Sequence, residues 1–307
     1  MSAELVELRA GDLVAAYAPH VGMVCASLRH RGEELLGQRQ GLQAYAEKGS
    51  TFGIPLLHPW ANRLQAWELE VLGRPVRLEG SPFVRADEHG LPIHGMLAAS
   101  PRWTVLELTP ERLRATFEFD DAALLAAFPF PHRLELDVRL GPDALETRTT
   151  LTPTGEMAVP LAFGFHPYLR IPGVARADWE IGLPVRRRIV LDDRGLPTGD
   201  TEDVEPYTGP LGDLTFDDGY DRLEPGEPFW VAGGGRRLEV AFGVGYPVAQ
   251  VFAPPGQELI CFEPMAAPTN ALADGDVPTV SPGERAEADF AVRVVRQPAP
   301  GSPIPAA

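Results

Sequence analysis

The chain has few of the residues on which several large protein classes depend. It carries 27 basic residues against 43 acidic ones, which gives a formal net charge of −16 at pH 7. A chain with this charge repels polyanions, so we expect no nucleic-acid partner and no membrane partner. Its only lysine, Lys48, lies in a polar stretch. A catalytic Schiff-base lysine is therefore not expected.

Cysteines and long apolar runs are scarce as well. The two cysteines, Cys25 and Cys261, lie far apart and form no Cys-x-x-Cys pair, so neither a disulfide framework nor a metal site is expected. No run of about 18 apolar residues is present, which argues against a membrane helix. The acidic start of the chain lacks the apolar core of a signal peptide. We therefore expect a soluble, cytoplasmic protein.

Turn-forming residues and alternating patterns are abundant instead. The 307 residues include 31 glycines and 32 prolines without a regular period, which favours a turn-rich β protein. Apolar and polar residues alternate with a period of two, as in antiparallel strands that are buried on one face. The clearest alternating segments are residues 112–119, 134–140, 238–242 and 290–294. Further strands are expected at residues 4–9, 13–17, 24–29, 67–71, 103–108, 145–151 and 259–263.

Helical patterns are rare. Residues 120–127 fit two helical turns that begin at Asp120 or Asp121 and end before Pro129. Strands and helices do not alternate along the chain, which argues against a doubly wound parallel sheet. The sequence predicts an all-β fold, a single large antiparallel β-sandwich domain over residues 1–296. A proline-rich, disordered tail is expected at residues 297–307.

Polar side chains interrupt several segments whose other residues are apolar. Asn62 and Arg63 follow an apolar stretch and a Pro-Trp turn, His166 lies among aromatic residues, and Glu263 ends an apolar strand. His94, which precedes a glycine, is a weaker example. A buried carboxylate is costly unless it is paired, so Glu263 indicates either a structural ion pair or a proton-transfer group. A histidine and a carboxylate on opposite sides of a small molecule would form an acid/base pair.

These segments resemble the motifs of the aldose 1-epimerase (galactose mutarotase) family. Five motifs follow one another in the family order between residues 53 and 270, and together they are far more specific than any one alone. The resemblance implies a large antiparallel β-sandwich, the galactose mutarotase-like supersandwich, in agreement with the period of two. The motifs are Pro-Trp-Ala-Asn-Arg-Leu at 59–64, His-Gly at 94–95, Gly-Phe-His-Pro-Tyr-Leu at 164–169, Gly-Tyr-Asp-Arg at 219–222, and Phe-Glu-Pro-Met at 262–265 with Asn270 downstream.

The resemblance also implies a reaction, the interconversion of the α and β anomers of a free aldose by ring opening. Glu263 matches the family's catalytic base for the anomeric hydroxyl, and His166 matches the histidine that protonates the ring oxygen. Desolvation lowers the pKa of a histidine and a nearby carboxylate raises it, and with Glu263 close by we expect the protonated form of His166 to persist near neutral pH. Both steps are proton transfers, so no cofactor is implied. The other matching residues are His94, which holds the ring oxygen or a neighbouring hydroxyl, Arg63 and Asp221, which grip sugar hydroxyls, and Asn62, which flanks Arg63.

Other functions stay open. A hexose 6-phosphate epimerase would need arginines for the phosphate, and Arg39 and the run at 186–188 are candidates. A sugar-binding protein without turnover is a third possibility, although binding alone needs no buried acid/base pair such as Glu263 and His166. The alternatives to a catalytic role are a structural ion pair for Glu263 and a place in the core for His166.

Two departures from the well-studied galactose-type members leave the identity of the sugar open. Pro167 follows His166 where those members tend to have a serine, and His58-Pro59-Trp60 precedes the Asn-Arg pair. His58 itself is expected to cap a turn and is given no role. The remaining expectations are a monomer or homodimer, and surface positions for His20, His30 and His132.

Overall fold

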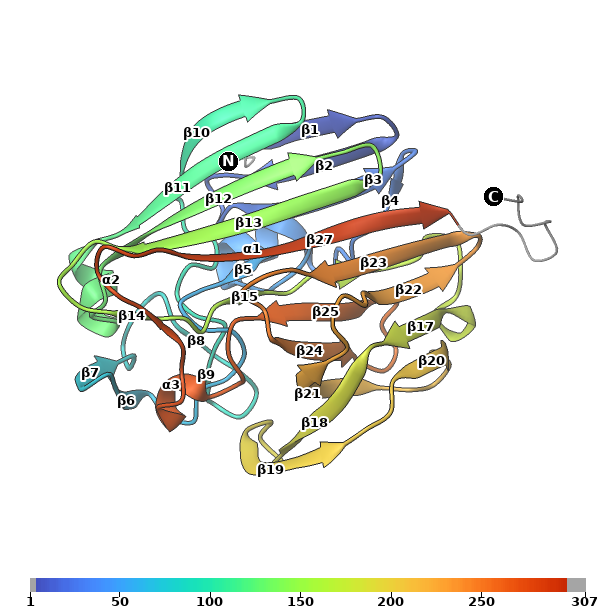
Figure 1. Cartoon of the computed structure of the whole chain (residues 1–307). Helices are drawn as coiled ribbons and strands as arrows, with labels where there is room; N and C mark the ends of the chain where they lie inside the picture. The colour runs from blue at the N-terminus through green and yellow to red at the C-terminus, as the bar shows by residue number, and fades with distance from the viewer. Residues whose placement is uncertain (1–3, 297–307) are drawn as a thin grey trace.

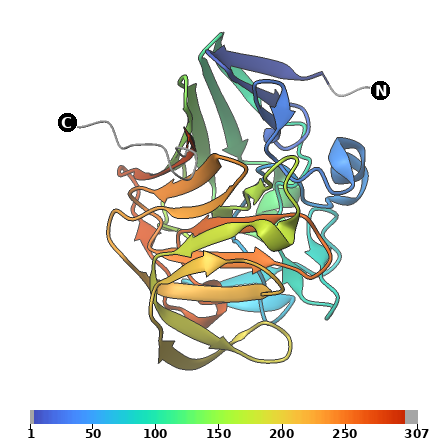
Figure 2. The ribbon, with the colours of Figure 1, turned by 90° about the vertical axis from the view of Figure 1, so that its right-hand side faces the viewer.

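The computed structural model describes residues 4–296, so the tail expected at residues 297–307 lies outside the described part. Two large, mainly antiparallel sheets pack over a shared core (Figure 1), which confirms the all-β sandwich. Figure 2, turned by 90°, shows the amino-terminal strands and the first helix on one side of the molecule, away from the yellow and orange strands of the second large sheet.

The first large sheet has nine strands and is built around the alternating segments. Along β11 and β12 buried and less buried residues alternate, because one face of the sheet covers the core and the other faces solvent. In spatial order the strands are β10 (Thr104–Thr109), β11 (Arg112–Phe119), β12 (His132–Leu140), β13 (Ala144–Pro153), β27 (Ala286–Arg296), β23 (Arg236–Phe242), β22 (Phe229–Gly233), β17 (Glu180–Leu183) and β20 (Tyr207–Pro210).

The second large sheet has eight strands, and its central strand β25 is buried at all six residues. Strands buried on both faces read as continuous apolar runs. Seven strands follow one another as β19 (Pro197–Asp203), β18 (Val185–Leu191), β21 (Phe216–Leu223), β24 (Val248–Ala253), β25 (Ile260–Met265), β15 (Gly164–Phe165) and β5 (Leu56–Leu57), and β16 (Tyr168–Leu169) also pairs with β25.

Smaller elements complete the described part of the chain. A four-stranded sheet contains β1 (Val6–Ala10), β2 (Leu13–Ala18), β3 (Val24–His30) and β4 (Glu33–Glu34). The two-stranded sheets are β6 (Glu68–Val71) with β7 (Arg74–Arg77), β8 (Arg85–Ala86) with β9 (Pro92–Ile93), and β14 (Val159–Pro160) with β26 (Thr279–Val280). The helices are α1 (Gly41–Lys48), α2 (Ala122–Ala127), α3 (Ala271–Asp274) and the 3₁₀ turn η1 (Arg176–Asp178).

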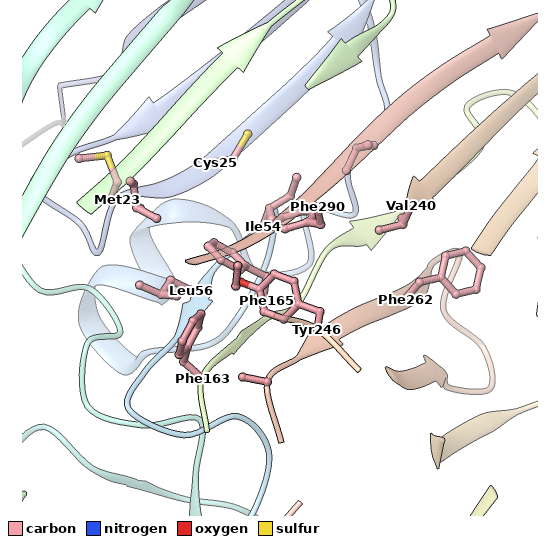
Figure 3. Packing of buried hydrophobic residues seen from close by; sticks show 14 of the residues in the cluster. Met23, Cys25, Ile54, Leu56, Phe163, Phe165, Val240, Tyr246, Phe262 and Phe290 are labelled. Atoms are coloured by element: carbon pink, nitrogen blue, oxygen red, sulfur yellow. The ribbon is translucent and has the colours of Figure 1, made fainter. Parts of the chain in front are cut away.

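Aromatic side chains join the two large sheets (Figure 3). Phe165 of β15 packs on Phe290 of β27 with ring centroids 4.9 Å apart. Phe262 of β25 packs on Phe229 of β22, with ring centroids 5.5 Å apart. Large buried rings contribute much apolar area, on the order of 150–250 Å² each. Strands β15 and β25, which lie next to or carry candidate site residues, are therefore packed against the nine-stranded sheet through the main core.

The local predictions for helices were partly right. The helix expected at 120–127 is α2, and the Asp121 side chain accepts a hydrogen bond from the amide of Ala123 at 2.8 Å, as an N-cap does. Helix α1 was not predicted. Among its residues only Tyr45 is buried, so its sequence shows little of the helical apolar pattern.

Three histidine predictions were wrong. His132 and His58 are fully buried, and His30 is only 8% exposed, whereas His20 is exposed as expected. The Nε2 atoms of His58 and His132 lie 2.7 Å apart. Because His132 Nδ1 donates to the carbonyl oxygen of Phe130 at 2.6 Å, its Nε2 accepts a hydrogen bond, and His58 Nε2–H donates it. The pair is a hydrogen-bonded part of the core and does not lie at the surface or in a turn.

Candidate active site

A cavity of about 200 Å³ lies beside the central strands of the eight-stranded sheet. Five of the six predicted site residues line it: Asn62, Arg63, His94, His166 and Glu263. They come from four segments that are distant in sequence, and the antiparallel pairing of β5, β15 and β25 brings three of these segments together. A site of this size holds a small molecule.

Glu263 and His166 are in direct contact at the buried end of this cavity. His166 Nε2 lies 3.2 Å from Glu263 Oε1, and the two side chains are only 6% and 2% exposed. Glu263 is held in β25, whereas His166 directly follows β15, the neighbouring strand. A buried carboxylate and a buried imidazole at this distance can exchange one proton between them. The structure thus places a proton donor and a proton acceptor side by side.

The electrostatics of this pair differ from the sequence-based expectation. Burial, with a smaller contribution from Asp217, raises the pKa of Glu263 well above its usual range. Burial lowers the pKa of His166 well below its usual range, and His94 and Arg39 lower it further. The expectation that Glu263 would keep His166 protonated near neutral pH was therefore wrong. Loss of hydration disfavours both charges more than the neighbouring carboxylate favours the imidazolium.

His94 also packs against His166. The two rings meet edge to face, with centroids 5.5 Å apart and planes at 76°. Burial, followed by the nearby Arg63 and Arg39, lowers the pKa of His94 to about 3, so its imidazole is neutral near pH 7. The residue has a positive φ of 61°, which few non-glycine residues adopt. A neutral imidazole in this position can donate one hydrogen bond to a ligand but is a poor proton donor.

Asn62 and Arg63 form the polar wall of the cavity. Arg63 Nε donates to Asp87 at 2.6 Å, and its Nη2 donates to Glu88 at 3.1 Å. The Asn62 side chain accepts from the backbone amide of Arg63 at 2.9 Å, and the Asn62 carbonyl accepts from the amide of His94 at 3.0 Å. Asn62 also has a positive φ, 57°. Two strained residues are thus locked together by hydrogen bonds, a pattern that is frequent at functional sites.

Asn270, the last residue of the motif series, supports this wall from behind. Its side-chain oxygen accepts a hydrogen bond from the amide of Gln65 at 2.8 Å, and its own amide donates to the carbonyl of Arg63 at 3.1 Å. Asn270 does not line the cavity. It connects the segment before α3 to the segment that presents Arg63.

Asp221 is not brought to the cavity, contrary to expectation. Its carboxylate forms two hydrogen bonds with Arg187, from Nε at 2.7 Å and from Nη2 at 3.0 Å. Asp217, four residues earlier on β21, lines the cavity instead and lies 3.8 Å from Arg63 Nη1. Four residues along a strand span roughly 13 Å, so the two carboxylates serve different neighbours.

Sequence reasoning missed Gln250. It pairs with Glu263 across β24 and β25, is only 2% exposed, and donates to Asp217 at 2.7 Å. A polar residue inside the apolar run Val248–Phe252 was a visible signal of the same kind that pointed to Glu263. Asp217 had no such signal, because the acidic segment around it also fits an ordinary solvated surface.

The described residues 4–296 show no gathering of three or more histidine, cysteine, aspartate or glutamate side chains that could hold a metal ion. Within the same part of the chain, no helix has both the length and the apolar character needed to cross a membrane.

Comparison with known proteins agrees with this architecture. Among solved structures, a galactose mutarotase-like protein from Clostridium acetobutylicum has a TM-score of 0.81 at 16% identity, covering 95% of both chains. A putative aldose 1-epimerase from Escherichia coli K12 has a TM-score of 0.77 at 17% identity, covering 95% of this chain and 99% of that one. Galactose 1-epimerase from Lactobacillus acidophilus has a TM-score of 0.73 at 14% identity, with 95% of both chains covered.

At these identities the likeness concerns the fold. No curated protein matches the chain. The family profile described as aldose 1-epimerase, however, matches residues 4–292, almost the entire described part. The chain belongs to the aldose 1-epimerase family.

Proposed function

We propose that the protein is a mutarotase that interconverts the α and β anomers of a free aldose. The observation that carries this proposal is the 3.2 Å contact between His166 Nε2 and Glu263 Oε1 at the buried end of a cavity that admits only a small molecule. A sugar in this cavity would place its anomeric hydroxyl and its ring oxygen, which are bonded to the same carbon, beside the two members of the pair.

The reaction moves the single proton of the pair through the sugar. The Glu263 carboxylate takes the proton of the anomeric hydroxyl, and the protonated His166 gives its proton to the ring oxygen while the C1–O5 bond breaks. Rotation about C1–C2 turns the open aldehyde over, and the reverse transfers close the ring on its other face. The pair holds one proton before and after each step, so the buried site gains no net charge. No cofactor is needed.

The remaining residues of the cavity would bind and orient the sugar. Arg63 is held by Asp87 and Glu88 and presents guanidinium N–H groups, whereas Asp217 and Gln250 offer hydrogen-bond acceptors. His94 donates one hydrogen bond to the ring oxygen or a neighbouring hydroxyl. Groups fixed in this way would increase the reaction rate, because they hold the sugar in the reactive orientation.

Of the arginines considered for a sugar phosphate, only Arg39 still supports a hexose 6-phosphate as substrate. The run at residues 186–188 is occupied by carboxylates, since Arg186 pairs with Glu224, Arg187 with Asp221 and Arg188 with Glu202. Arg39, however, lines the cavity and has no carboxylate within ion-pair distance among the described residues. A hexose 6-phosphate is therefore the second candidate substrate.

A monomer or homodimer in the cytoplasm remains a prediction from the sequence.

Polarimetry on freshly dissolved sugars tests the proposal. The enzyme is expected to accelerate the approach to rotational equilibrium of at least one of α-glucose, α-galactose and α-xylose. Acceleration confined to α-glucose 6-phosphate would favour the phosphorylated alternative through Arg39. Binding of a sugar without any acceleration would contradict the enzyme proposal and indicate a sugar-binding protein.

A further inference from the structure

A hydrogen-bonded group beside His166 has no part in the reaction scheme above. It consists of Tyr168 in β16, Thr51 in the segment after α1, and Arg39 just before α1. The Tyr168 hydroxyl lies 2.6 Å from Thr51 Oγ1 and accepts a hydrogen bond from Arg39 Nη1 at 3.0 Å. Tyr168 itself is only 1% exposed. Two residues that flank α1, 117 and 129 residues away from Tyr168 in sequence, therefore fix its phenolic oxygen.

The ring of Tyr168 lies flat against the ring of His166. The centroids are 4.1 Å apart, the planes differ by 7°, and the hydroxyl oxygen lies 3.1 Å from His166 Nε2. Because the planes are parallel and the contact is this short, the oxygen lies over the face of the imidazole. The hydrogen or lone pair of Nε2 points along the plane of the ring. That direction stays free for Glu263 and for the ring oxygen of a sugar.

The hydrogens around the phenolic oxygen follow from the chemistry of its partners. A guanidinium can only donate, so Tyr168 accepts from Arg39. Either hydroxyl could donate in the 2.6 Å contact between Tyr168 and Thr51 Oγ1. Because the phenolic oxygen lies over the imidazole face, away from the in-plane lone pair of Nε2, we assign its hydrogen to Thr51 Oγ1. A lone pair of the Tyr168 oxygen is therefore left over Nε2. A lone pair in that place favours the positively charged imidazole over the neutral one.

We propose that Tyr168, fixed by Thr51 and Arg39, is a positioning residue that stabilises protonated His166 while leaving its Nε2 free to give a proton to the sugar. The inference rests on the proposed function for the role of that proton. Tyr168 acts through His166 and takes no proton itself, since burial, the largest influence on it, raises the pKa of its hydroxyl.

Arg39 has the opposite influence on His166. Its guanidinium is separated from Nε2 only by the phenolic oxygen, and a second positive charge so near disfavours the imidazolium. The other titratable groups that face the ring are Glu263 on β25, which favours the imidazolium, and His94 after β9, which is neutral. Phe252 on β24 contributes only an uncharged edge. Tyr168 and Arg39 thus shift the same equilibrium in opposite directions.

Two variants separate this role from a structural one. Tyr168→Phe keeps the stacked ring and removes the oxygen, so the alkaline limb of kcat/KM should move to lower pH, with kcat reduced roughly three- to tenfold and KM nearly unchanged. Arg39→Gln should move the same limb to higher pH. Tyr246→Phe, which removes the hydroxyl of a buried tyrosine in the core, is the matched control and should leave the profile unchanged.

The imidazole titration of His166, followed by NMR and assigned with a His166→Asn variant, supplies a second readout that needs no substrate. It should move in the same two directions. The proposal is overturned if both variants titrate like the wild type, if both shift the same way, or if Tyr168→Phe lowers Tm and leaves the pH profile unchanged. Should Tyr168→Phe fail to fold, Thr51→Val takes its place: it removes the hydroxyl that fixes the Tyr168 oxygen and should move the alkaline limb in the same direction, to lower pH. A wild-type protein that accelerates no aldose would instead contradict the proposed function, and the NMR comparison would still test Tyr168.

Discussion

At the scale of single residues, the candidate site depends on one proton held between Glu263 and His166. Burial disfavours the charged form of each group, so the uncharged pair, with the proton on the carboxyl, is stabilised relative to the ion pair. In the proposed reaction, the ion pair acts on the closed sugar, and the uncharged pair is the form left after ring opening. An acid/base pair is most efficient when these two forms are close in free energy, because the proton transfers are then nearly balanced.

The first prediction concerns Glu263. Glu263→Gln keeps the size of the side chain but removes the base, so kcat should fall by about 10²- to 10⁴-fold. Tm should stay near the wild-type value, because the change removes a carboxyl whose burial is costly. Polarimetric rates and a thermal melt measure the two effects. Wild-type turnover in this variant would disprove the assignment of the base.

The second prediction concerns the pH profile and the two histidines. Activity requires one proton in the pair, so kcat/KM should be bell-shaped: a second proton stops the reaction at low pH, and loss of the single proton stops it at high pH. His166→Asn should remove about 10²-fold or more of the rate. His94→Asn should cost about tenfold, because it removes a hydrogen bond and no proton. An inactive His94→Asn beside an active His166→Asn would reverse the two roles.

At the scale of elements, adjacent strands and tight backbone contacts decide which side chains meet. The register of β24 on β25 places Gln250 opposite Glu263 on one face of the sheet. The loop after β9 is fixed differently. The carbonyl of His58 accepts hydrogen bonds from the amides of Met96 and Leu97, which seats the loop against the segment after β5. His94 is aimed by this backbone contact.

The third prediction tests that contact. Gly95 has a φ of +74°, and a Cβ there would lie 2.1 Å from the carbonyl oxygen of His58. Gly95→Ala should therefore displace His94, lower kcat at least tenfold, and destabilise the fold by more than about 1–2 kcal/mol. Gly90→Ala is the matched control, since Gly90 has the same φ, +75°, and nothing within 4 Å of an added Cβ. Equal losses in the two variants would show that φ strain alone, and not the backbone contact, accounts for the effect.

At the scale of the whole molecule, the two large sheets bury several histidines in the uncharged state. Burial lowers the pKa of His132 to about 4 and, with His132 beside it, lowers the pKa of His58 well below its usual range. The hydrogen bond between their Nε2 atoms needs one unprotonated nitrogen, so protonation breaks it. The core is therefore sensitive to acid before most carboxylates titrate.

The fourth prediction is this acid sensitivity. A lowered folded-state pKa stabilises the protein at pH values above the unfolded value, about 6.5, and the contribution is lost as the pH falls towards 4. His132 alone should account for about 2 kcal/mol between pH 7 and pH 5. Chemical denaturation at the two pH values measures it. The His132→Asn variant should lose less stability than the wild type over this interval, whereas His20→Asn, at an exposed position, should lose as much as the wild type. An undiminished loss in His132→Asn would contradict the prediction.

The fifth prediction concerns metal ions and nucleotides. The sequence has no metal-ligand spacing and no phosphate-binding loop, and the proposed chemistry consists of proton transfers. Dialysis against a chelator, in buffer without nucleotides, should leave the polarimetric rate unchanged. A rate lost on dialysis and restored by one divalent ion would overturn this expectation.

The sequence by itself determined the fold class and most of the residues of the candidate site. Alternation with a period of two directly reports which face of a strand is buried, so the β-sandwich was predictable from segments such as 112–119 and 134–140. Glu263 and His166 could be recognised because burying a polar group inside an apolar segment costs free energy unless the group has a bonding partner or a function. These signals are local, and local signals can be read from one chain.

Only the tertiary structure decided which neighbours each group has. Asp221 and Asp217 are two aspartates of the same acidic segment, and the sequence does not distinguish them. Because they lie four residues apart on β21, Asp221 pairs with Arg187, whereas Asp217 reaches the cavity beside Arg63. His132 stands in an ordinary alternating strand, yet it is buried against His58, which lies 74 residues away. The protonation of His166 likewise depends on burial and on Arg39 and His94, which approach from other segments. Desolvation and long-range pairing arise from packing, and packing is not contained in local sequence patterns.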